Sequence, residues 1–270
     1  MVRLTDSEFL EFVKYMHNNY GIDLSKKKIL IEGRLSGLLD KKGMSSFSQY
    51  LESVKNNNKD EIAMLVNKLT TNYTYFYREE SHFEHLKEVI LSEKEKEKEN
   101  KSKILNIWSA GCSSGEEPYT TAMVLDDYFK SRINQWEIHI NATDISENVL
   151  SKARKGIYPQ DSIEKLPKSY KEMYFKKINN NEYEVIPEIK KYITFKVFNL
   201  MDTILEKNKY DVIFLRNVMI YFNIETKKHI VNKIYDANKP GGYLLIGHAE
   251  ALQRDKSKYI YIKPAIYKKE

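Results

Sequence analysis

Two adjacent glutamates follow a turn of small residues near the middle of the chain, in the segment Gly-Cys-Ser-Ser-Gly-Glu-Glu-Pro-Tyr at 111–119. An apolar strand is predicted at 104–108, directly before this turn, and Pro118 suits the first turn of a helix after it. A strand, a small-residue turn and a helix in this order are typical of the nucleoside-binding turn of a doubly wound α/β sheet. The segment is therefore predicted to bind a nucleotide or nucleoside, with room for close approach to the backbone of Gly111.

Glu116 and Glu117 indicate which class of ligand this turn favours. A phosphate cradle offers backbone N–H groups and commonly a lysine, so two carboxylates would repel a pyrophosphate. Carboxylates suit a ligand with positive charge, such as the amino group and sulfonium centre of S-adenosylmethionine. Glutamates at the start of a helix also stabilise the helix dipole, so a structural role stays open for each of them.

Three further loops are expected at the same edge of the sheet, because ligands of such folds lie outside the carboxyl ends of the strands. Asp144 follows the second predicted strand, where a carboxylate can bind both hydroxyls of a ribose. An aspartate in this position is often only a helix cap. The other two loops follow the third and fourth predicted strands and carry Asn199, Leu200, Asn217 and Val218. Four polar loops together favour an adenosine-type ligand.

The first part of the chain has helical periodicity. Residues 1–70 are predicted to form an all-α domain, in which Thr5 and Glu8 have the spacing of a capping box. Residues 71–100 are predicted to form a linker and a connecting helix. The stretch at 93–103 alternates glutamate and lysine and is expected to be an exposed helix end or loop.

Residues 101–270 alternate strands and helices, which predicts an α/β domain with a parallel sheet. Residues 157–194 interrupt this alternation with two short β segments around an asparagine turn at 179–181. They are predicted to be an inserted small antiparallel β subdomain. A closing hairpin at 259–267 is expected to add an antiparallel edge to the main sheet.

The composition is that of an ordinary globular protein, with 41% hydrophobic and 30% charged residues among 270. Its apolar runs are far shorter than a membrane span, no apolar signal core follows the first methionine, and the single cysteine excludes an internal disulfide framework. A cytoplasmic protein without membrane insertion is therefore expected. The net charge of +6 favours an acidic partner, but nothing indicates nucleic acid. No residue spacing indicates a metal, and His248 is expected to be structural.

The helix predicted at 25–42 is basic, with six lysines and arginines against two acidic residues, a net charge of +4. Lys27, Arg34 and Lys41 are seven residues apart, so they drift only about 40° around a helix axis in total. They form a basic stripe. A solvated face and a docking surface are both compatible with this pattern.

Five motifs resemble those of the CheR-type chemotaxis receptor glutamate O-methyltransferases. The resemblance is collinear over essentially the whole chain, and it lies in 71–79 (Thr-Asn-Tyr-Thr-Tyr-Phe-Tyr-Arg-Glu), 108–119, 142–145, 216–222 and 247–250. It implies an all-α domain followed by a Rossmann-like S-adenosylmethionine-dependent methyltransferase domain with a small β subdomain. It also implies methylation of glutamates on chemoreceptor cytoplasmic helices, with S-adenosylhomocysteine as the second product.

The resemblance also implies roles for individual residues. Glu116 matches the cofactor-binding acid of the motif, with Glu117 as a second candidate, and Asp144 would bind the ribose. Arg78 and Tyr221 match residues that stand near the transferred methyl group. The remaining residues that the motifs place around the cofactor are Asn72 and Thr74 of the linker, Gly111, Asn199, Leu200, Asn217 and Val218.

The implied partner gives the basic stripe a use, because chemoreceptor methylation helices are rich in glutamate. Lys27, Arg34 and Lys41 become candidate docking residues of a monomeric enzyme. One departure from the family concerns the β subdomain, where the turn at 176–184 is short and has no glycine. We therefore expect no dependence on a receptor C-terminal pentapeptide. Two alternatives stay open: a related methyltransferase with another acidic protein substrate, and a non-catalytic S-adenosylmethionine-binding module.

Overall fold

The computed structural model describes residues 2–56, 59–70, 73–253 and 257–270, except the side chains of 59 and 60. Four helices form the N-terminal part: α1 (Asp6–Tyr20), α2 (Lys28–Lys41), α3 (Phe47–Lys55) and α4 (Lys59–Leu69). The predicted capping box of Thr5 and Glu8 begins α1, and Gly21 ends it in the left-handed conformation, with φ 68°. The helix predicted at 25–42 begins only at Lys28, because Ser25 and Lys26 form a turn.

The main sheet has seven strands in the order β6-β2-β1-β7-β8-β10-β9. The five strands from β6 to β8 pair in parallel, and β10 and β9 form the antiparallel edge that the closing hairpin predicts. Their bounds are β1 (Ile104–Ala110), β2 (Glu137–Asp144), β6 (Ile193–Val197), β7 (Tyr210–Leu215), β8 (Asn238–Ile246), β9 (Ile260–Lys263) and β10 (Ile266–Lys268). The predicted α/β class is confirmed.

Helices cover this sheet and connect its strands. They are α5 (Ser81–His85), a π-helical turn (Leu86–Ile90), α6 (Leu91–Glu97), α7 (Glu116–Phe129), α8 (Glu147–Lys155) and α11 (Ile224–Ala237). The prediction that the Glu- and Lys-rich stretch is exposed is wrong for two lysines. Lys94 is 1% exposed and donates to the carbonyl oxygen of Gly241, and Lys98 forms an ion pair with Asp211 at 3.1 Å. The stretch therefore packs along the sheet.

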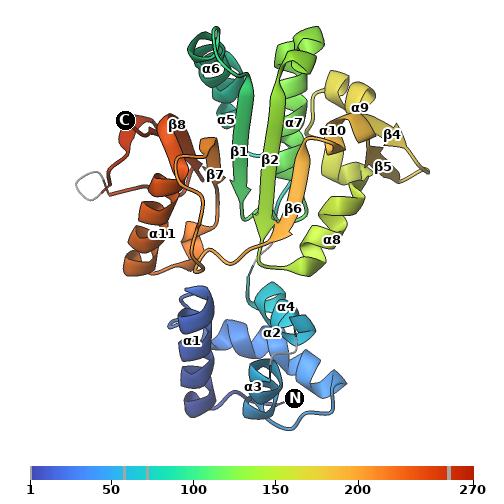
Figure 1. Ribbon diagram of the computed structural model, residues 1–270. Helices are drawn as coiled ribbons and strands as arrows, with labels where there is room; N and C mark the ends of the chain where they lie inside the picture. The colour runs from blue at the N-terminus through green and yellow to red at the C-terminus, as the bar shows by residue number, and fades with distance from the viewer. Residues whose placement is uncertain (1, 57–58, 71–72, 254–256) are drawn as a thin grey trace.

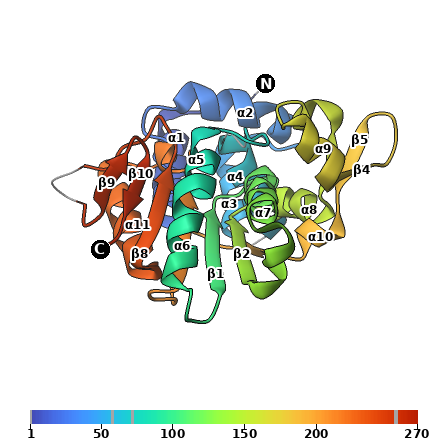
Figure 2. The same cartoon turned by 90° about the horizontal axis from the view of Figure 1, so that it is seen from above.

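The predicted inserted β subdomain is a separate sheet of three strands in the order β3-β5-β4. It contains β3 (Ile157–Pro159), α9 (Lys168–Tyr174), β4 (Phe175–Lys177), β5 (Glu182–Val185) and α10 (Pro187–Lys190). Sequence periodicity missed β3, which has only three residues. Seen from above, this small sheet and the β8–β10 edge lie at opposite ends of the molecule (Figure 2).

The carboxyl ends of the parallel strands face the helical domain, which lies beneath the sheet in Figure 1. The end of α1 contacts the strand loops directly. Ile22 pairs with Phe222 in an antiparallel bridge, and the backbone N–H of Asp23 donates to the carbonyl oxygen of Tyr221 at 2.8 Å. None of the described helices is long and apolar enough to cross a bilayer.

Candidate active site

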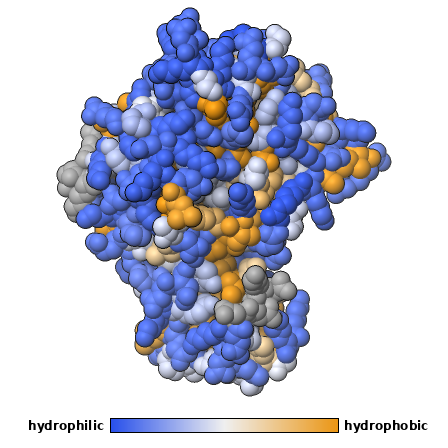
Figure 3. Space-filling model, viewed as in Figure 1, coloured by the Kyte–Doolittle hydropathy of each residue, from blue (hydrophilic) through white to orange (hydrophobic). Residues whose placement is uncertain are grey.

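A cavity of about 320 Å³ lies where the strand loops, the linker and the end of α1 meet. This volume is within the range of small-molecule sites in proteins. Apolar residues gather on the surface at this junction, between the sheet and the helical domain (Figure 3). Most residues that the sequence assigned to the site line the cavity together: Thr74, Arg78, Gly111, Glu117, Asp144, Asn199, Leu200, Asn217, Val218 and Tyr221. Asn72 lies outside the described residues.

The two glutamates at the start of α7 have different surroundings. Glu117 lines the cavity, where its Oε1 accepts from Ser109 Oγ at 2.6 Å and its Oε2 lies 3.2 Å from Arg216 Nη1. Glu116 is buried, accepts from Ser114 Oγ at 2.8 Å, and is absent from the lining. The geometry thus favours Glu117 over Glu116 as the acid beside a ligand. Burial raises the pKa of both carboxyl groups, and the Arg216 guanidinium opposes this rise for Glu117.

Asp144 ends β2 with its carboxylate held by the backbone on both sides. Oδ2 accepts from the N–H of Ser113 at 2.9 Å, and Oδ1 accepts from the N–H of Ser146 at 3.0 Å. The N-cap of α8 is Ser146 rather than Asp144, since Ser146 Oγ accepts from the N–H of Val149. The helix-cap alternative for Asp144 is therefore wrong. Its carboxylate orders the turn after β1 and lines the cavity.

Gly111 allows the loops after β1 and β7 to approach each other closely. It has φ +85°, and a Cβ at this position would lie 2.5 Å from Val218 Cγ2. Ser113, two residues on, also has a positive φ of 49°. Its Oγ is buried and has no hydrogen-bond partner among the described residues. A buried hydroxyl at the wall of a cavity is available to a ligand.

Arg78 and Tyr221 both line the cavity. Arg78 donates from Nη1 to the carbonyl oxygen of Tyr73 at 2.6 Å, and its guanidinium lies 5.8 and 6.0 Å from the ring centroids of Tyr73 and Tyr75. The aromatic rings hold this cation in place. Tyr221 ends a short 3₁₀ turn (Met219–Tyr221), and the hydrogen bond from Asp23 fixes its backbone.

Arg216 is a residue of the site to which the sequence analysis gave no role. It is 5% exposed, lines the cavity, and bridges the carboxylates of Glu117 and Glu79, with 3.3 Å between its Nη2 and Glu79 Oε2. It also donates to the carbonyl oxygen of Arg78. The sequence did contain a signal for this residue, because Arg216 is a single cation directly after the fully buried strand β7. Arg216 joins the linker to the turn after β1.

Glu250 was also missed, although it is part of a recognised motif. Its Oε2 accepts from the N–H groups of Asn217 at 2.9 Å and Gly247 at 2.7 Å, and its Oε1 accepts from the N–H of Ile220 at 3.1 Å. Asn217 adopts a positive φ of 58°, a left-handed conformation that asparagine tolerates better than most residues with a Cβ. The Glu250 carboxylate therefore stabilises the conformation of the loop that carries Asn217, Val218 and Tyr221.

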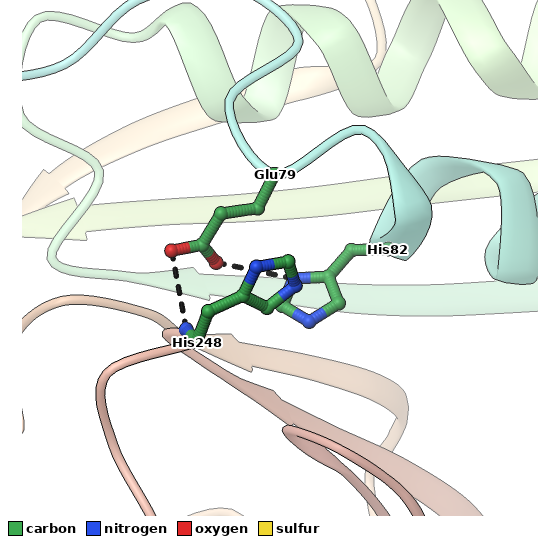
Figure 4. Close-up of side chains that lie close together, drawn as sticks. All are labelled: Glu79, His82 and His248. Carbon is green, nitrogen blue, oxygen red and sulfur yellow. Dashed lines mark hydrogen bonds and ion pairs between the residues drawn. The ribbon is translucent and has the colours of Figure 1, made fainter.

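Glu79, His82 and His248 form a compact cluster next to the loop that carries Asn217 (Figure 4). Their potential ligand atoms lie within 4.8 Å of one another, the one such group among the described residues. Glu79 Oε1 accepts from the N–H of His248 and from Asn217 Nδ2, while Oε2 faces Arg216. Since the guanidinium repels a cation, the cluster is better explained as a hydrogen-bonded support of the linker. The prediction of no metal stays a prediction.

The residues of the basic stripe differ in their surroundings. Lys27 and Lys41 are exposed. Arg34 donates from Nη1 to the carbonyl oxygens of Lys68 and Thr70, both at 3.0 Å, so it caps the end of α4. Arg34 therefore has a structural role that the spacing of the stripe did not indicate.

Comparison with known proteins identifies the family. The family described as "CheR methyltransferase, SAM binding domain" matches residues 72–267, and "CheR methyltransferase, all-alpha domain" matches residues 7–70. The chain belongs to the CheR methyltransferase family. A chemotaxis protein methyltransferase of Borreliella burgdorferi is 44% identical, covering 99% of this chain and 96% of the relative. Chemotaxis protein methyltransferase 1 of Pseudomonas aeruginosa is 33% identical, covering 97% of both chains. Chemotaxis protein methyltransferase 1 of Vibrio cholerae is 32% identical, covering 98% of this chain and 97% of the relative.

The cavity of this CheR methyltransferase suits S-adenosylmethionine, the cofactor of the family. The Glu117 and Asp144 carboxylates offer negative charge to a cationic ligand that also has hydroxyl groups. Gly111 lines the cavity, where its missing Cβ lets Val218 pack against the turn, and the unsatisfied Ser113 Oγ offers a further hydrogen bond. The protein is an S-adenosylmethionine-dependent protein methyltransferase.

Proposed function

We propose that this enzyme methylates glutamate side chains on the cytoplasmic helices of chemoreceptors. The observation that carries the proposal is the pairing, in one cavity, of a cofactor wall containing Glu117 and Asp144 with Arg78 and Tyr221. The relatives named as chemotaxis protein methyltransferases support the choice of substrate. In this proposal the enzyme acts as a cytoplasmic monomer.

The reaction asks little acid–base chemistry of the protein. A glutamate is already a carboxylate at pH 7, so no general base is needed to make it a nucleophile. S-adenosylmethionine supplies a methyl group on a sulfonium, and transfer forms a carboxylate O–CH₃ bond as the S–CH₃ bond breaks. In our proposal, Arg78 orients the substrate carboxylate and Tyr221 supports it with a hydrogen bond. The remaining acceleration comes from positioning and from exclusion of water.

The same proposal assigns the cofactor-binding wall. Glu117 binds the positively charged end of the cofactor, and Asp144 binds its ribose. Thr74, Gly111, Asn199, Leu200, Asn217 and Val218 complete the wall, and all of them line the cavity. Glu116 shapes the turn from behind through Ser114. Asn72 keeps the cofactor-binding role that its motif implies.

Substrate docking is proposed for the exposed face of α2. Lys27 and Lys41 attract the acidic receptor helix, and Arg34 adds positive charge while it caps α4. The turn of the β subdomain is a tight hairpin, in which the N–H of Ile178 donates to the carbonyl oxygen of Glu182 at 2.9 Å. We propose that receptor binding does not require a C-terminal pentapeptide. Calorimetric binding of such a peptide would contradict this.

Transfer of labelled methyl from S-adenosylmethionine to a purified receptor cytoplasmic domain tests the function. The expected product is a base-labile ester on glutamate. Label on another acidic protein, with none on receptors, would favour the related methyltransferase of different substrate. Cofactor binding without transfer to any protein would favour the non-catalytic module.

A further inference from the structure

Two isoleucines beside the cavity have large exposed fractions. Ile220 is 54% exposed and Ile224 is 63% exposed. Ile220 lines the cavity next to Tyr221, and Ile224 is the first residue of α11. An apolar surface therefore begins at the cavity and continues along the start of α11, where that helix meets the helical domain (Figure 1).

A second hollow, of about 150 Å³, continues this surface. Ile224 lines it together with apolar residues of α11 and of the loop after β8: Met219, Val231, Ala251 and Leu252. Lys227 and Lys228 also line it. Glu225 is exposed nearby, and Gln253 and Ser257, which flank the residues outside the described ranges, complete the lining with Asn232. The hollow thus combines an apolar floor with positive charge.

The surface is held in a fixed conformation. The Glu250 carboxylate accepts from the N–H of Ile220 at 3.1 Å, and Phe222 is bridged to Ile22. Asn223 caps α11, its Oδ1 accepting from the N–H of Thr226 at 2.9 Å. The isoleucines are therefore presented to solvent by a rigid scaffold, an arrangement typical of a preformed binding surface.

We infer that Ile220, Ile224, Lys227 and Lys228 form a docking surface for the receptor methylation helix, in addition to the proposed docking residues on α2. The inference rests on the proposed function. An amphipathic acidic helix would place apolar side chains on the isoleucines and carboxylates on the lysines. The surface is continuous with the cavity at Ile220, so the turn of the helix next to the acceptor glutamate reaches it. The helical domain and the methyltransferase domain then both contact the substrate.

Ile224→Ser and the double variant Lys227→Gln/Lys228→Gln test the inference, since none of these residues lines the cofactor cavity. Leu205→Ser is the matched control, because Leu205 is 85% exposed and lines neither hollow. The measurements are KM and kcat for the receptor cytoplasmic domain, the Kd for S-adenosylhomocysteine by calorimetry, and the Tm.

The KM for receptor should rise by about tenfold in Ile224→Ser, and by about tenfold again in the triple variant that combines Ile224→Ser with Lys227→Gln/Lys228→Gln, equivalent to about 1.4 kcal/mol per step. The kcat, the Kd for S-adenosylhomocysteine and the Tm should stay near their wild-type values, and Leu205→Ser should match the wild type throughout. An unchanged KM in the triple variant overturns the docking surface alone. A wild-type enzyme that forms no receptor ester overturns the proposed function, and the docking surface with it.

Discussion

Arg216 Nη1 lies 3.2 Å from Glu117 Oε2, so a buried cation fixes the carboxylate that the cavity presents to its ligand. The same guanidinium reaches Glu79 and the backbone of Arg78. Glu117 is therefore held in place before any cofactor arrives, and binding does not have to order its side chain.

Glu117→Gln should weaken S-adenosylmethionine binding by about 10- to 100-fold, because a hydrogen bond to a charged group contributes about 1.5–3 kcal/mol. Calorimetry with S-adenosylhomocysteine measures the change. Glu116→Gln is the matched control and should have the smaller effect, since Glu116 does not line the cavity. A larger loss of affinity in Glu116→Gln would instead make Glu116 the main cofactor-binding acid, as the motif implies.

Tyr221→Phe should lower kcat by about tenfold while leaving cofactor affinity close to wild type, because it removes a hydrogen bond of about 1–1.5 kcal/mol to the reacting carboxylate. The phenylalanine ring keeps the apolar packing of Tyr221, and the backbone hydrogen bonds of this residue are unchanged, so the Tm should stay near the wild-type value. Single-turnover transfer to receptor separates chemistry from binding. Unchanged turnover would remove Tyr221 from the proposed mechanism.

Glu250→Gln should reduce both cofactor affinity and kcat. Both oxygens of Glu250 accept from backbone N–H groups, so either amide orientation sets an NH₂ group against a donor, at a cost of about 1–3 kcal/mol. Asp211→Asn is the control: this carboxylate is fully buried and forms ion pairs with Lys98 and Lys239 at the opposite end of the sheet. It should lower Tm without changing the Kd for cofactor. Equal catalytic effects in the two variants would argue that Glu250 serves stability only.

His82 should make the protein less stable as the pH falls below neutrality. Burial and the Arg216 charge lower the pKa of His82 to about 3, so between about 6.5 and 3 the unfolded chain binds a proton that the folded chain does not. From pH 7 to pH 5 this residue should reduce the free energy of unfolding by about 2 kcal/mol. Urea denaturation of wild type and His82→Gln at both pH values measures the difference. The same loss in the variant would assign the pH dependence to other groups.

The double variant Lys27→Gln/Lys41→Gln should raise the KM for receptor with little change in Tm, because both side chains are exposed. Added salt should raise the wild-type KM and affect the variant less. Arg34→Gln should lower Tm as well, because Arg34 binds the carbonyl oxygens of Lys68 and Thr70. A salt-independent KM in the wild type would exclude electrostatic docking on α2.

Local signals predicted most of the elements. The capping box of Thr5 and Glu8 begins α1 as expected, since it depends only on neighbouring residues. The start of β8 is not indicated by the sequence, because Pro240 and the two glycines after it are typical of a turn. In the structure the strand begins at Asn238, whose Nδ2 donates to the carbonyl oxygens of Tyr210 and Tyr243.

The composition of the cavity wall was predictable because parallel strands end at one edge, which brings their loops together. The contacts that fix those loops were not. Arg216 and Glu79 are 137 residues apart in the chain, and Glu250 and Asn217 are 33 apart. No local pattern reports which distant carboxylate a cation or a loop N–H will meet. The choice between Glu116 and Glu117 likewise depends on how α7 is rotated against the sheet.

The bridge between Ile22 and Phe222, with the hydrogen bond from Asp23 to Tyr221, makes the end of α1 a part of the wall beside the proposed reacting groups. The helical domain therefore cannot be replaced without changing contacts to the catalytic domain. A chimera that takes this domain from a relative to change receptor preference would also alter the backbone that carries Tyr221. On the proposed roles of α2 and Tyr221, changes in the helical domain that alter receptor choice would also act on turnover.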